Sequence, residues 1–460
     1  MTPTLTFLGA VGTVTGSRFL VTTPTAQVLL DCGLFQGGRE LRERNWAPPP
    51  FDPRALDAVV ITHAHLDHTG YLPALVRAGY RGPVYATPYT AALTRIVLLD
   101  SAHLQEEEAE YANRKGYSRH RPALPLYDRD DAHHALASLR ELPFDTVTTV
   151  AHGVEVRLQR AGHILGSSSA VVHLSSGERL FASGDVGRPS HPILRPPAPF
   201  PEVDVALVES TYGNRAHEPE AEAMERLATV VSRVARQGGV VVIPAFAVDR
   251  TEVVLHAIAE LRREDRIPDL PIHVDSPMAL SVLHVYRAAI AAGDPELRIG
   301  PRDADPFESG EVHEARTTDE SKQINRIAYP CVIVSSSGMA NGGRVLHHLA
   351  QRLPDARNAV VLAGFQAEGT RGRALAEGTR VLKLFGRYVP VRAEVTMIDA
   401  FSVHADADEL IGWMRPAAEP RTTFVVHGEP SASHALRDRL TGELDWTAVV
   451  PTYGERVRLD

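Results

Sequence analysis

A short stretch of the chain concentrates side chains that bind metal ions. Residues 62–68 read Thr-His-Ala-His-Leu-Asp-His, so three imidazoles and one carboxylate lie within six residues. Buried imidazoles need polar partners, and an apolar core does not provide enough of them for such a cluster. Imidazole and carboxylate ligands together are typical of Zn²⁺, with Mn²⁺ and iron as alternatives. Because a turn presents alternate residues to two sides of a small volume, His63 and His65 would face one ion, and Asp67 and His68 another.

Three later segments each add one candidate ligand. His163 lies between two glycines in Ala-Gly-His-Ile-Leu-Gly, and Asp185 and His427 each follow a run of residues that favours a strand. A single histidine at the end of a strand is more often structural than functional. Sheet proteins nevertheless collect their sites at the carboxyl ends of strands. Three such residues in order behind the histidine cluster therefore favour one shared metal site.

The composition excludes several other classes of protein. The chain has 460 residues, with 48 basic and 57 acidic residues and a net charge of −9, so its overall charge does not indicate nucleic acid. The two cysteines, Cys32 and Cys331, are too few for a disulfide framework or a thiolate zinc site. Neither a signal peptide nor 18 consecutive apolar residues are found, so we expect a cytoplasmic protein with no membrane span.

The predicted secondary-structure elements that position these residues differ between the first and the later part of the chain. Short β-rich runs separated by Gly, Thr and Pro dominate the first part, with a helical pattern over residues 86–140. A proline-rich stretch at 189–201 marks a boundary. Beyond it strands and helices alternate, which indicates a mostly parallel sheet covered by helices, and residues 381–384 continue that alternation. We expect residues 303–321 to form a loop, and two further strand–helix pairs and a last strand to follow residue 394.

The order of these motifs resembles that of the metallo-β-lactamase superfamily. Residues 63–68 match its His-x-His-x-Asp-His motif. Asp31 in Leu-Leu-Asp-Cys-Gly matches the first motif, and His163 and Asp185 match the next two. The resemblance implies an α/β protein whose metallo-β-lactamase domain is an αββα sandwich.

Three further residues narrow the resemblance to the β-CASP branch of that superfamily. Glu209, His404 and His427 are similar to its motifs A, B and C. That branch includes bacterial ribonuclease J and the endonuclease subunit of the mRNA 3′-end cleavage complex. One departure is Asp249, where relatives often have glycine, and this puts the local charge in doubt rather than the fold.

The resemblance implies how the ligands divide between two Zn²⁺ ions, with Mn²⁺ as an alternative metal. Asp185 would bridge the ions, and Asp31 would orient a ligand histidine through its second ring nitrogen. The first ion would be bound by His63, His65, His163 and Asp185. The second would be bound by Asp67, His68, Asp185 and His427.

Such a pair of ions suits the hydrolysis of a phosphodiester, because it supplies hydroxide and stabilises both the attacking and the leaving oxygen. The leaving ribose oxygen still needs a proton. His404 is the candidate donor, since imidazole can be protonated near pH 7, and Glu209 would hold it in orientation. We assign His404, Glu209 and Asp67 to catalysis.

The charge distribution favours RNA as the partner. Residues 322–392 contain eleven basic and three acidic residues, a net charge of +8, so the rest of the chain carries −17. A basic block inside an acidic protein is expected for a site that binds a polyanion, although a set of solvated helix faces gives the same pattern. Candidate substrate-binding residues in this block are Ser336, Ser337, Gly338, Arg344, Gln366 and Arg371.

We therefore predict a zinc-dependent ribonuclease, an endoribonuclease by the resemblance, that acts on single-stranded RNA without a small-molecule cofactor. The expected domains are a metallo-β-lactamase domain at 1–208 and 393–460 and a β-CASP domain inserted at 209–392. The alternatives are a hydrolase of small esters, lactones or lactams, a DNA nuclease, and a catalytically degenerate RNA-binding scaffold. The sequence leaves open the choice between endonuclease and 5′ exonuclease, the sequence preference, the oligomeric state and the pathway.

Overall fold

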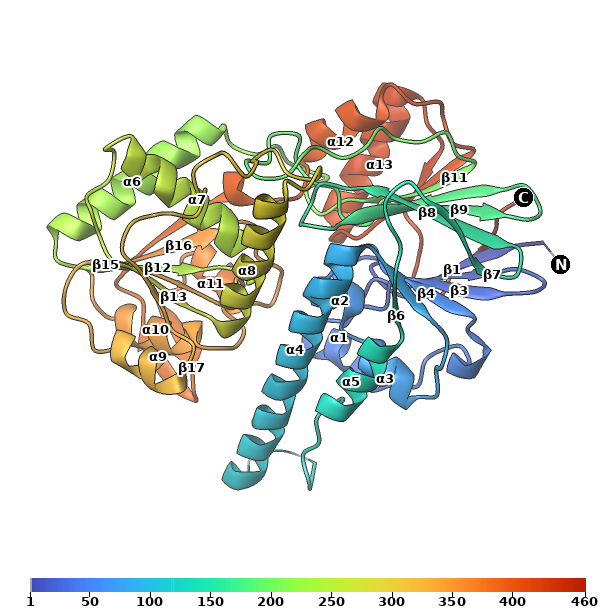
Figure 1. Cartoon of the computed structure of the whole chain (residues 1–460). Coiled ribbons are helices and arrows are strands. Elements are labelled where there is room, and N and C mark those ends of the chain that lie inside the picture. Colours follow the sequence, from blue (N-terminus) through green and yellow to red (C-terminus); the bar gives the residue numbers. More distant parts are fainter. Residues whose placement is uncertain (1, 117, 119) are drawn as a thin grey trace. The chain divides into compact units, whose positions relative to one another are not determined.

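The chain folds into two compact units. The computed structural model describes residues 2–116, 118 and 120–460 (Figure 1). The first unit runs to Ala216 and resumes at His404, and the second unit is His217–Val403. The second unit is therefore an insertion between two segments that fold together.

The first sheet of the first unit is mixed. Its strands pair antiparallel from β22 to β3 and parallel from β3 to β6. In β1 the side chains alternate between half-buried and buried, as expected for a strand with one face on a core. In spatial order the strands are β22 (Arg456–Arg458), β1 (Thr4–Phe7), β2 (Phe19–Thr22), β3 (Gln27–Leu30), β4 (Ala58–Val60), β5 (Val84–Ala86) and β6 (Leu139–Glu141).

The second sheet of this unit begins as an antiparallel meander from β7 to β10 and continues in parallel pairs through β11 and β20 to β21. The parallel strand β11 is buried along its whole length and β20 is buried beyond its first residue, and both are rich in apolar residues. In spatial order the strands are β21 (Ala448–Val449), β20 (Thr422–Val426), β11 (Val205–Glu209), β10 (Arg179–Ala182), β9 (Ser168–Leu174), β8 (Val154–Arg160) and β7 (Val147–Ala151).

The two sheets pack face to face between layers of helices. One apolar cluster joins side chains of both sheets, such as Phe7 and Val28 from the first and Leu158 and Phe424 from the second. Separate clusters lie on the two outer faces. The helices of these clusters are α3 (Leu72–Arg77), α4 (Pro88–Lys115) and α5 (Arg129–Ala137) on the first sheet, and α12 (Ala407–Met414) and α13 (Pro430–Leu444) on the second. This αββα arrangement confirms the predicted fold class.

The second unit is built on a parallel sheet with helices on both of its faces (Figure 1). In spatial order its strands are β14 (Val312–Glu314), β13 (Ile272–Asp275), β15 (Cys331–Ser335), β12 (Val240–Pro244), β16 (Ala359–Ala363) and β19 (Glu394–Ile398). Its helices are α6 (Glu220–Arg236), α7 (Arg250–Arg263), α8 (Pro277–Ala292), α9 (Thr318–Ile324), α10 (Val345–Arg352) and α11 (Arg371–Ala376).

Two local predictions for this unit are wrong. Residues 381–384 do not join the parallel sheet, because β17 (Val381–Leu384) pairs antiparallel with β18 (Arg387–Pro390) across a two-residue turn. Residues 303–321 are not all loop, because β14 adds an edge strand and Thr317 caps α9 through a reciprocal capping box with Glu320.

Residues 86–140 form two helices, α4 and α5, and residues 117 and 119 between them lie outside the described residues. Short helical elements complete the chain: α1 (Arg39–Arg44), η1 (Pro53–Ala55), α2 (Leu66–Thr69) and η2 (Asp399–Phe401). None of the helices within the described residues is long and apolar enough to cross a membrane.

Candidate metal centre

The candidate ligands come from strand ends of both sheets in the first unit. His63 follows β4 by three residues, and His65 is the N-cap of the short helix α2, which carries Asp67 and His68. His163 follows β8, Asp185 follows β10 and His427 follows β20. Because the two sheets pack against each other, these ends meet in one volume.

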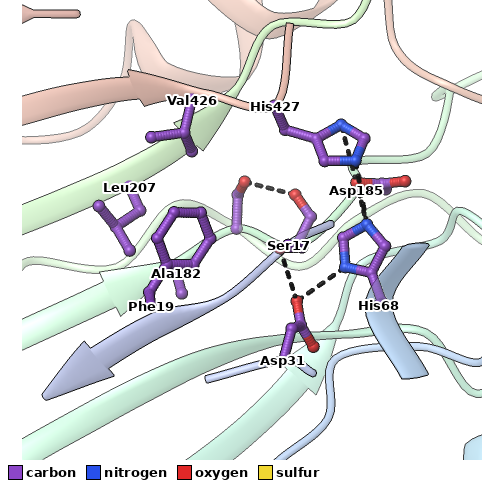
Figure 2. A pocket seen from close by; sticks show the side chains of 11 residues that line it. Ser17, Phe19, Asp31, His68, Ala182, Asp185, Leu207, Val426 and His427 are labelled. Atoms are coloured by element: carbon purple, nitrogen blue, oxygen red, sulfur yellow. Dashed lines mark hydrogen bonds and ion pairs between the residues drawn. The ribbon is translucent and has the colours of Figure 1, made fainter. Parts of the chain in front are cut away.

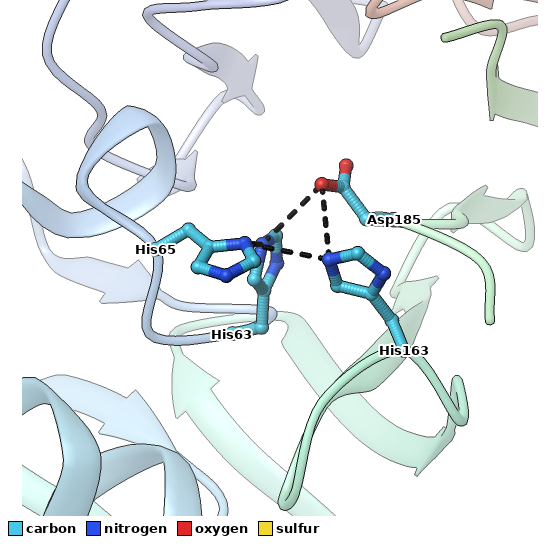
Figure 3. A group of neighbouring side chains, drawn as sticks. All are labelled: His63, His65, His163 and Asp185. Atoms are coloured by element: carbon cyan, nitrogen blue, oxygen red, sulfur yellow. Dashed lines mark hydrogen bonds and ion pairs between the residues drawn. The ribbon is translucent and has the colours of Figure 1, made fainter. Parts of the chain in front are cut away.

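The first group of ligands contains three imidazoles and one carboxylate oxygen. Nδ1 of His65 lies 3.1 Å from Nε2 of His63 and 3.3 Å from Nε2 of His163. Oδ2 of Asp185 lies 3.4 Å from Nε2 of His63 and 3.6 Å from Nε2 of His163. Figure 3 shows the four side chains pointing toward one another from three separate segments. His65 contributes Nδ1, whereas the other two histidines contribute Nε2.

The second group uses the other oxygen of the same aspartate. Nε2 of His68 and Nε2 of His427 are 3.1 Å apart. Oδ2 of Asp67 lies 3.5 Å from Nε2 of His427 and 4.0 Å from Nε2 of His68. Oδ1 of Asp185 lies 3.3 Å from Nε2 of His68. The two oxygens of Asp185 therefore face different groups of ligands.

These distances fit bound cations. Ligand atoms at about 2.0–2.1 Å from a zinc ion are about 3.3 Å apart along the edges of a tetrahedron. The four distances in the first group, from 3.1 to 3.6 Å, surround that value. Those in the second group are more scattered, from 3.1 to 4.0 Å. Buried ring nitrogens that face one another in this way need a cation or a shared proton between them, and the donor set suits a metal ion.

Asp31 fixes the orientation of His68. Its Oδ2 accepts a hydrogen bond from Nδ1 of His68 at 2.7 Å, which leaves Nε2 of that ring toward the second group (Figure 2). Its Oδ1 accepts from the backbone N–H of Thr62 at 2.8 Å. Asp31 has a φ of 57° and His427 a φ of 51°, so both hold a backbone conformation that is uncommon outside glycine. Strain of this kind is typical of functional sites.

The electrostatics keep the first group ready to bind a cation. Burial, helped by the neighbouring His63, lowers the pKa of His65 to about 3. Burial also lowers the pKa of His163 well below its ordinary value. Although burial opposes ionisation of Asp185, the neighbouring His427 and His68 hold the pKa of this carboxyl well below its usual range. At neutral pH the group therefore presents neutral imidazoles and a carboxylate, which are the protonation states that bind metal.

His404 and Glu209 lie beside the first group. Nδ1 of His404 lies 3.1 Å from Oε1 of Glu209, and the His404 ring centroid lies 4.4 Å from that of His163. The fully buried Glu209 also accepts the backbone N–H of Val186 at 2.8 Å and that of Thr211 at 3.1 Å. Because backbone groups fix the carboxylate, it in turn fixes the imidazole and directs Nε2 away from Glu209.

Close backbone approaches hold the ligand loops together. A Cβ added at Gly33 would lie 1.6 Å from the carbonyl oxygen of Asp67. One added at Gly187 would lie 1.7 Å from the carbonyl oxygen of Gly162, next to His163. Gly187 also forms an isolated antiparallel bridge with His404. Only glycine fits at these two positions without moving a ligand loop.

The predicted substrate-binding residues all lie in the second unit, at the carboxyl ends of β15 and β16 and at the start of two helices. Gln366 is buried and donates to the carbonyl oxygens of Gly338 and Gly364, both at 3.2 Å. Ser336 donates to the Ser276 hydroxyl at 2.8 Å, and the Ser337 hydroxyl accepts from the Asn341 N–H at 3.2 Å.

The two predicted arginines differ in how they are held. Arg344 is bound to the buried Asp275 at 2.8 Å, and it also donates to two backbone carbonyls. The guanidinium of Arg371 donates to the backbone carbonyls of Lys383 and Asn341, and no carboxylate among the described residues lies within ion-pair distance of it. Arg371 thus keeps its charge uncompensated, whereas the charge of Arg344 is matched inside the protein.

Three features of the two units were not predicted from the sequence. The hydroxyl of Thr62 lies 3.1 Å from Nδ1 of His63, and that of Thr211 lies 3.2 Å from Nδ1 of His427, so both help to orient ligand rings. The sequence did offer a signal for these two threonines, because Thr62 directly precedes the histidine cluster and Thr211 lies two residues after Glu209. Asp275 also binds the buried His348 at 2.6 Å, a contact between distant segments that no local pattern indicates.

The fold and the two ligand groups define a metallo-hydrolase, and comparisons with known proteins identify its family. Three family models match consecutive parts of the chain. They are the metallo-beta-lactamase superfamily at residues 11–232, the Beta-Casp domain at 251–375, and the Zn-dependent metallo-hydrolase RNA specificity domain at 388–451.

Relatives match over nearly the whole chain. Ribonuclease TTHA0252 of Thermus thermophilus is 38% identical over 93% of this chain and 94% of its own length. An RNase J-like protein of Methanocaldococcus jannaschii is 32% identical over 94% of each chain. Transcription termination factor FttA of Methanosarcina mazei is 32% identical over 99% of this chain and 71% of its own length. The chain therefore belongs to the β-CASP family of the metallo-β-lactamase superfamily, as the sequence motifs predicted.

Proposed function

We propose that this protein is a metal-dependent ribonuclease that hydrolyses phosphodiester bonds of single-stranded RNA with two Zn²⁺ ions. The observation that carries the proposal is the pair of ligand groups that share Asp185. The matched RNA specificity domain and the relatives named as ribonucleases support RNA as the substrate class. The cytoplasmic location expected from the sequence stays a prediction.

In the proposed site the chain would offer each ion its own set of ligands, and the bound ions would supply hydroxide and stabilise charge on the phosphoryl oxygens. Asp185 belongs to both sets, because its Oδ2 faces His63 and its Oδ1 faces His68. Mn²⁺ suits the same ligand types as an alternative metal. The ligands proposed for the first ion are His63, His65, His163 and Asp185, and those for the second are Asp67, His68, His427 and Asp185.

His404 is proposed as the general acid. Its Nδ1 is held by Glu209 at 3.1 Å, so Nε2 would carry the proton to the leaving ribose oxygen. Glu209 has both of its oxygens engaged by backbone N–H groups, so it acts as a positioning residue. Oδ2 of Asp67 lies 3.5 Å from Nε2 of His427 at the edge of the second group, where it would help to hold the second ion.

The experiment that tests the proposal is incubation of the metal-loaded protein with a 5′-labelled single-stranded RNA. We expect cleavage that a chelator abolishes and added Zn²⁺ or Mn²⁺ restores. The same sequence as DNA, and a lactone or lactam, serve as substrates for the alternative activities. Internal cuts independent of the 5′ end would identify an endonuclease, and a requirement for a 5′-phosphate would indicate a 5′ exonuclease. Cleavage of DNA or of a lactam with no cleavage of RNA would contradict the proposal.

A degenerate RNA-binding scaffold is the alternative outside enzymes. The donor atoms of His63, His65, His163 and Asp185 lie within 4.8 Å of one another, and so, as a separate group, do those of Asp67, His68 and His427, which argues against loss of the site. A protein that binds RNA but neither binds metal nor cleaves would establish that alternative instead.

A further inference from the structure

The β17–β18 hairpin of the second unit has two aromatic side chains that are exposed and do not pack into the hydrophobic core of that unit. Leu382 and Leu384, which are 4% and 1% exposed, pack into the apolar cluster on one face of the parallel sheet. Phe385 at the turn is 55% exposed, and Tyr388 is 74% exposed. The leucines anchor the hairpin, so the two aromatic rings contribute little to folding. Exposed apolar side chains that lie close together can mark a site of interaction, and these two lie on one short hairpin.

The turn of this hairpin is unfavourable for the residue that occupies it. Phe385 has a φ of 49° and Gly386 a φ of 76°, between the paired residues Leu384 and Arg387. Positive φ at both central positions is the pattern of a type I′ turn, which favours Asn-Gly. A bulky side chain is strained in this conformation. The backbone thus does not explain why a phenylalanine stands at the tip.

Neighbouring side chains hold both rings in place. The imidazole of His347 stacks on Phe385, with ring centroids 4.5 Å apart and an interplanar angle of 25°. Burial, together with the neighbouring His348, lowers the pKa of His347, so its ring is uncharged at neutral pH. The ammonium of Lys383 lies 5.8 Å from the centroid of Tyr388, its partner across the hairpin. The rings are therefore partly ordered before any ligand binds.

The surroundings of the hairpin are strongly cationic. Residues 371–392 contain six basic residues and one acidic residue, Glu377, and that carboxylate is already paired with Arg373. Arg371 ties the hairpin to α11 by donating to the carbonyl oxygen of Lys383 at 3.1 Å. Among the described residues, no carboxylate lies within ion-pair distance of four cations: Arg371, Arg380, Lys383 and Arg387.

We propose that Phe385 and Tyr388 form a base-stacking site for single-stranded RNA, and that the four uncompensated cations bind the adjoining phosphates. Aromatic platforms beside cations bind single strands without regard to sequence, because every base has a π face. The net charge of +5 in this segment favours a polyanion over an apolar protein surface. The inference rests on the proposed ribonuclease function, and it names where the second unit holds the substrate strand.

The test compares steady-state cleavage of a single-stranded RNA by the metal-loaded wild-type protein and two variants, Phe385→Asn and Tyr388→Ala. We expect each variant to raise KM by about 5- to 150-fold with kcat unchanged, because stacking contributes to binding and not to the chemical step. Phe385→Asn should also raise Tm, because Asn adopts the left-handed conformation more readily. A merely structural role for Phe385 predicts a lower Tm. Val381→Ala, at a non-aromatic exposed position of β17, is the matched control and should leave KM unchanged.

Competition with oligonucleotides separates stacking from charge. An oligonucleotide that carries bases should inhibit the wild-type protein more strongly than either variant, whereas an abasic one of equal length should inhibit all three alike. If the wild-type protein cleaves RNA and both variants have the same KM as the wild-type protein, the proposed stacking site is wrong, whereas the proposed ribonuclease function is supported. If the wild-type protein cleaves no RNA, the proposed function fails, and direct binding of the same RNA decides the stacking site. Equal affinity of all three proteins would then overturn it.

Discussion

Asp185 is the residue on which the proposed chemistry depends, because its two oxygens face different ligand groups. The residues around it differ in what they do. Asp31 accepts a hydrogen bond from Nδ1 of the candidate ligand His68, whereas Nδ1 of His404 lies against Glu209 and His404 belongs to neither candidate ligand group. Substitutions at these positions should therefore separate metal binding from proton transfer.

Replacement of His404 by alanine should leave both ions bound and slow the hydrolysis of RNA by roughly 10²–10⁴-fold, the usual contribution of a general acid. On a p-nitrophenyl phosphodiester the loss should be much smaller, because that leaving group needs no proton. Elemental analysis and rate measurements on both substrates check this. His68→Ala is the control, since a lost ligand should lower metal content and impair both substrates. Equal losses for His404→Ala on both substrates, with the metals retained, would remove His404 from the acid role.

Glu252 in the second unit gives a prediction about pH. It is fully buried, and neither of its oxygens has a hydrogen-bond partner among the described residues. Burial and the neighbouring Asp249 raise the pKa of Glu252 well above 4.5. The folded chain thus keeps a proton that the unfolded chain releases, so the free energy of unfolding falls as pH rises from about 4.5 to the raised pKa.

Glu252→Gln removes this ionisation and keeps the shape of the side chain. The variant should therefore gain stability relative to the wild-type protein as pH rises from about 4.5 toward the raised pKa of Glu252, and urea unfolding at several pH values measures the difference. Glu260→Gln, at a partly exposed position of the same helix, should show no such trend. A constant difference between Glu252→Gln and the wild-type protein across this pH range would show that Glu252 is ionised in the folded chain.

At the scale of elements, the site depends on how closely the loops after the strands approach one another. The loop after β10 passes the loop after β8 at Gly187, where a side chain would meet the carbonyl oxygen of Gly162 at 1.7 Å. Gly187→Ala should therefore separate Asp185 from His163 and destabilise the fold by about 1–3 kcal/mol. Metal content and thermal unfolding measure both effects. Gly412→Ala, in open space on α12, should instead stabilise the helix by up to about 1 kcal/mol.

The secondary-structure elements also explain which features of the fold and of the candidate site could be predicted from the sequence. The candidate metal ligands could be proposed from the sequence because they follow strand-like runs, and the αββα sandwich brings the ends of these strands together. The β17–β18 hairpin was missed because a strand of a parallel sheet and a strand of a hairpin have similar patterns over four residues. The pairing of Arg344 with Asp275 joins positions 69 residues apart, so no local pattern could indicate that a buried carboxylate lies beside this arginine.

At the scale of the whole molecule, the distribution of charge should govern the binding of RNA. The affinity should fall steeply with salt, because each phosphate contact releases counterions. Arg371→Ala should reduce the magnitude of the slope of log affinity against log salt by about 0.7, the value for one contact to a single strand. Arg357 is exposed but paired with Asp355 at 2.7 Å, so Arg357→Ala should leave the slope unchanged. If neither Arg371→Ala nor Arg357→Ala changed the slope, the result would contradict the prediction and indicate that the basic residues at 322–392 are solvated and do not contact phosphates.

The central claim is that two ions sharing Asp185 hydrolyse RNA, and a metal titration of the chelator-treated protein tests it most directly. Bound zinc per chain and the rate of cleavage of single-stranded RNA are measured in the same samples as Zn²⁺ is added. We expect no cleavage without metal, and a rate that rises with binding of the second ion and levels off at two ions per chain. Cleavage by metal-free protein, or a rate that is already maximal with one ion per chain, would contradict the claim.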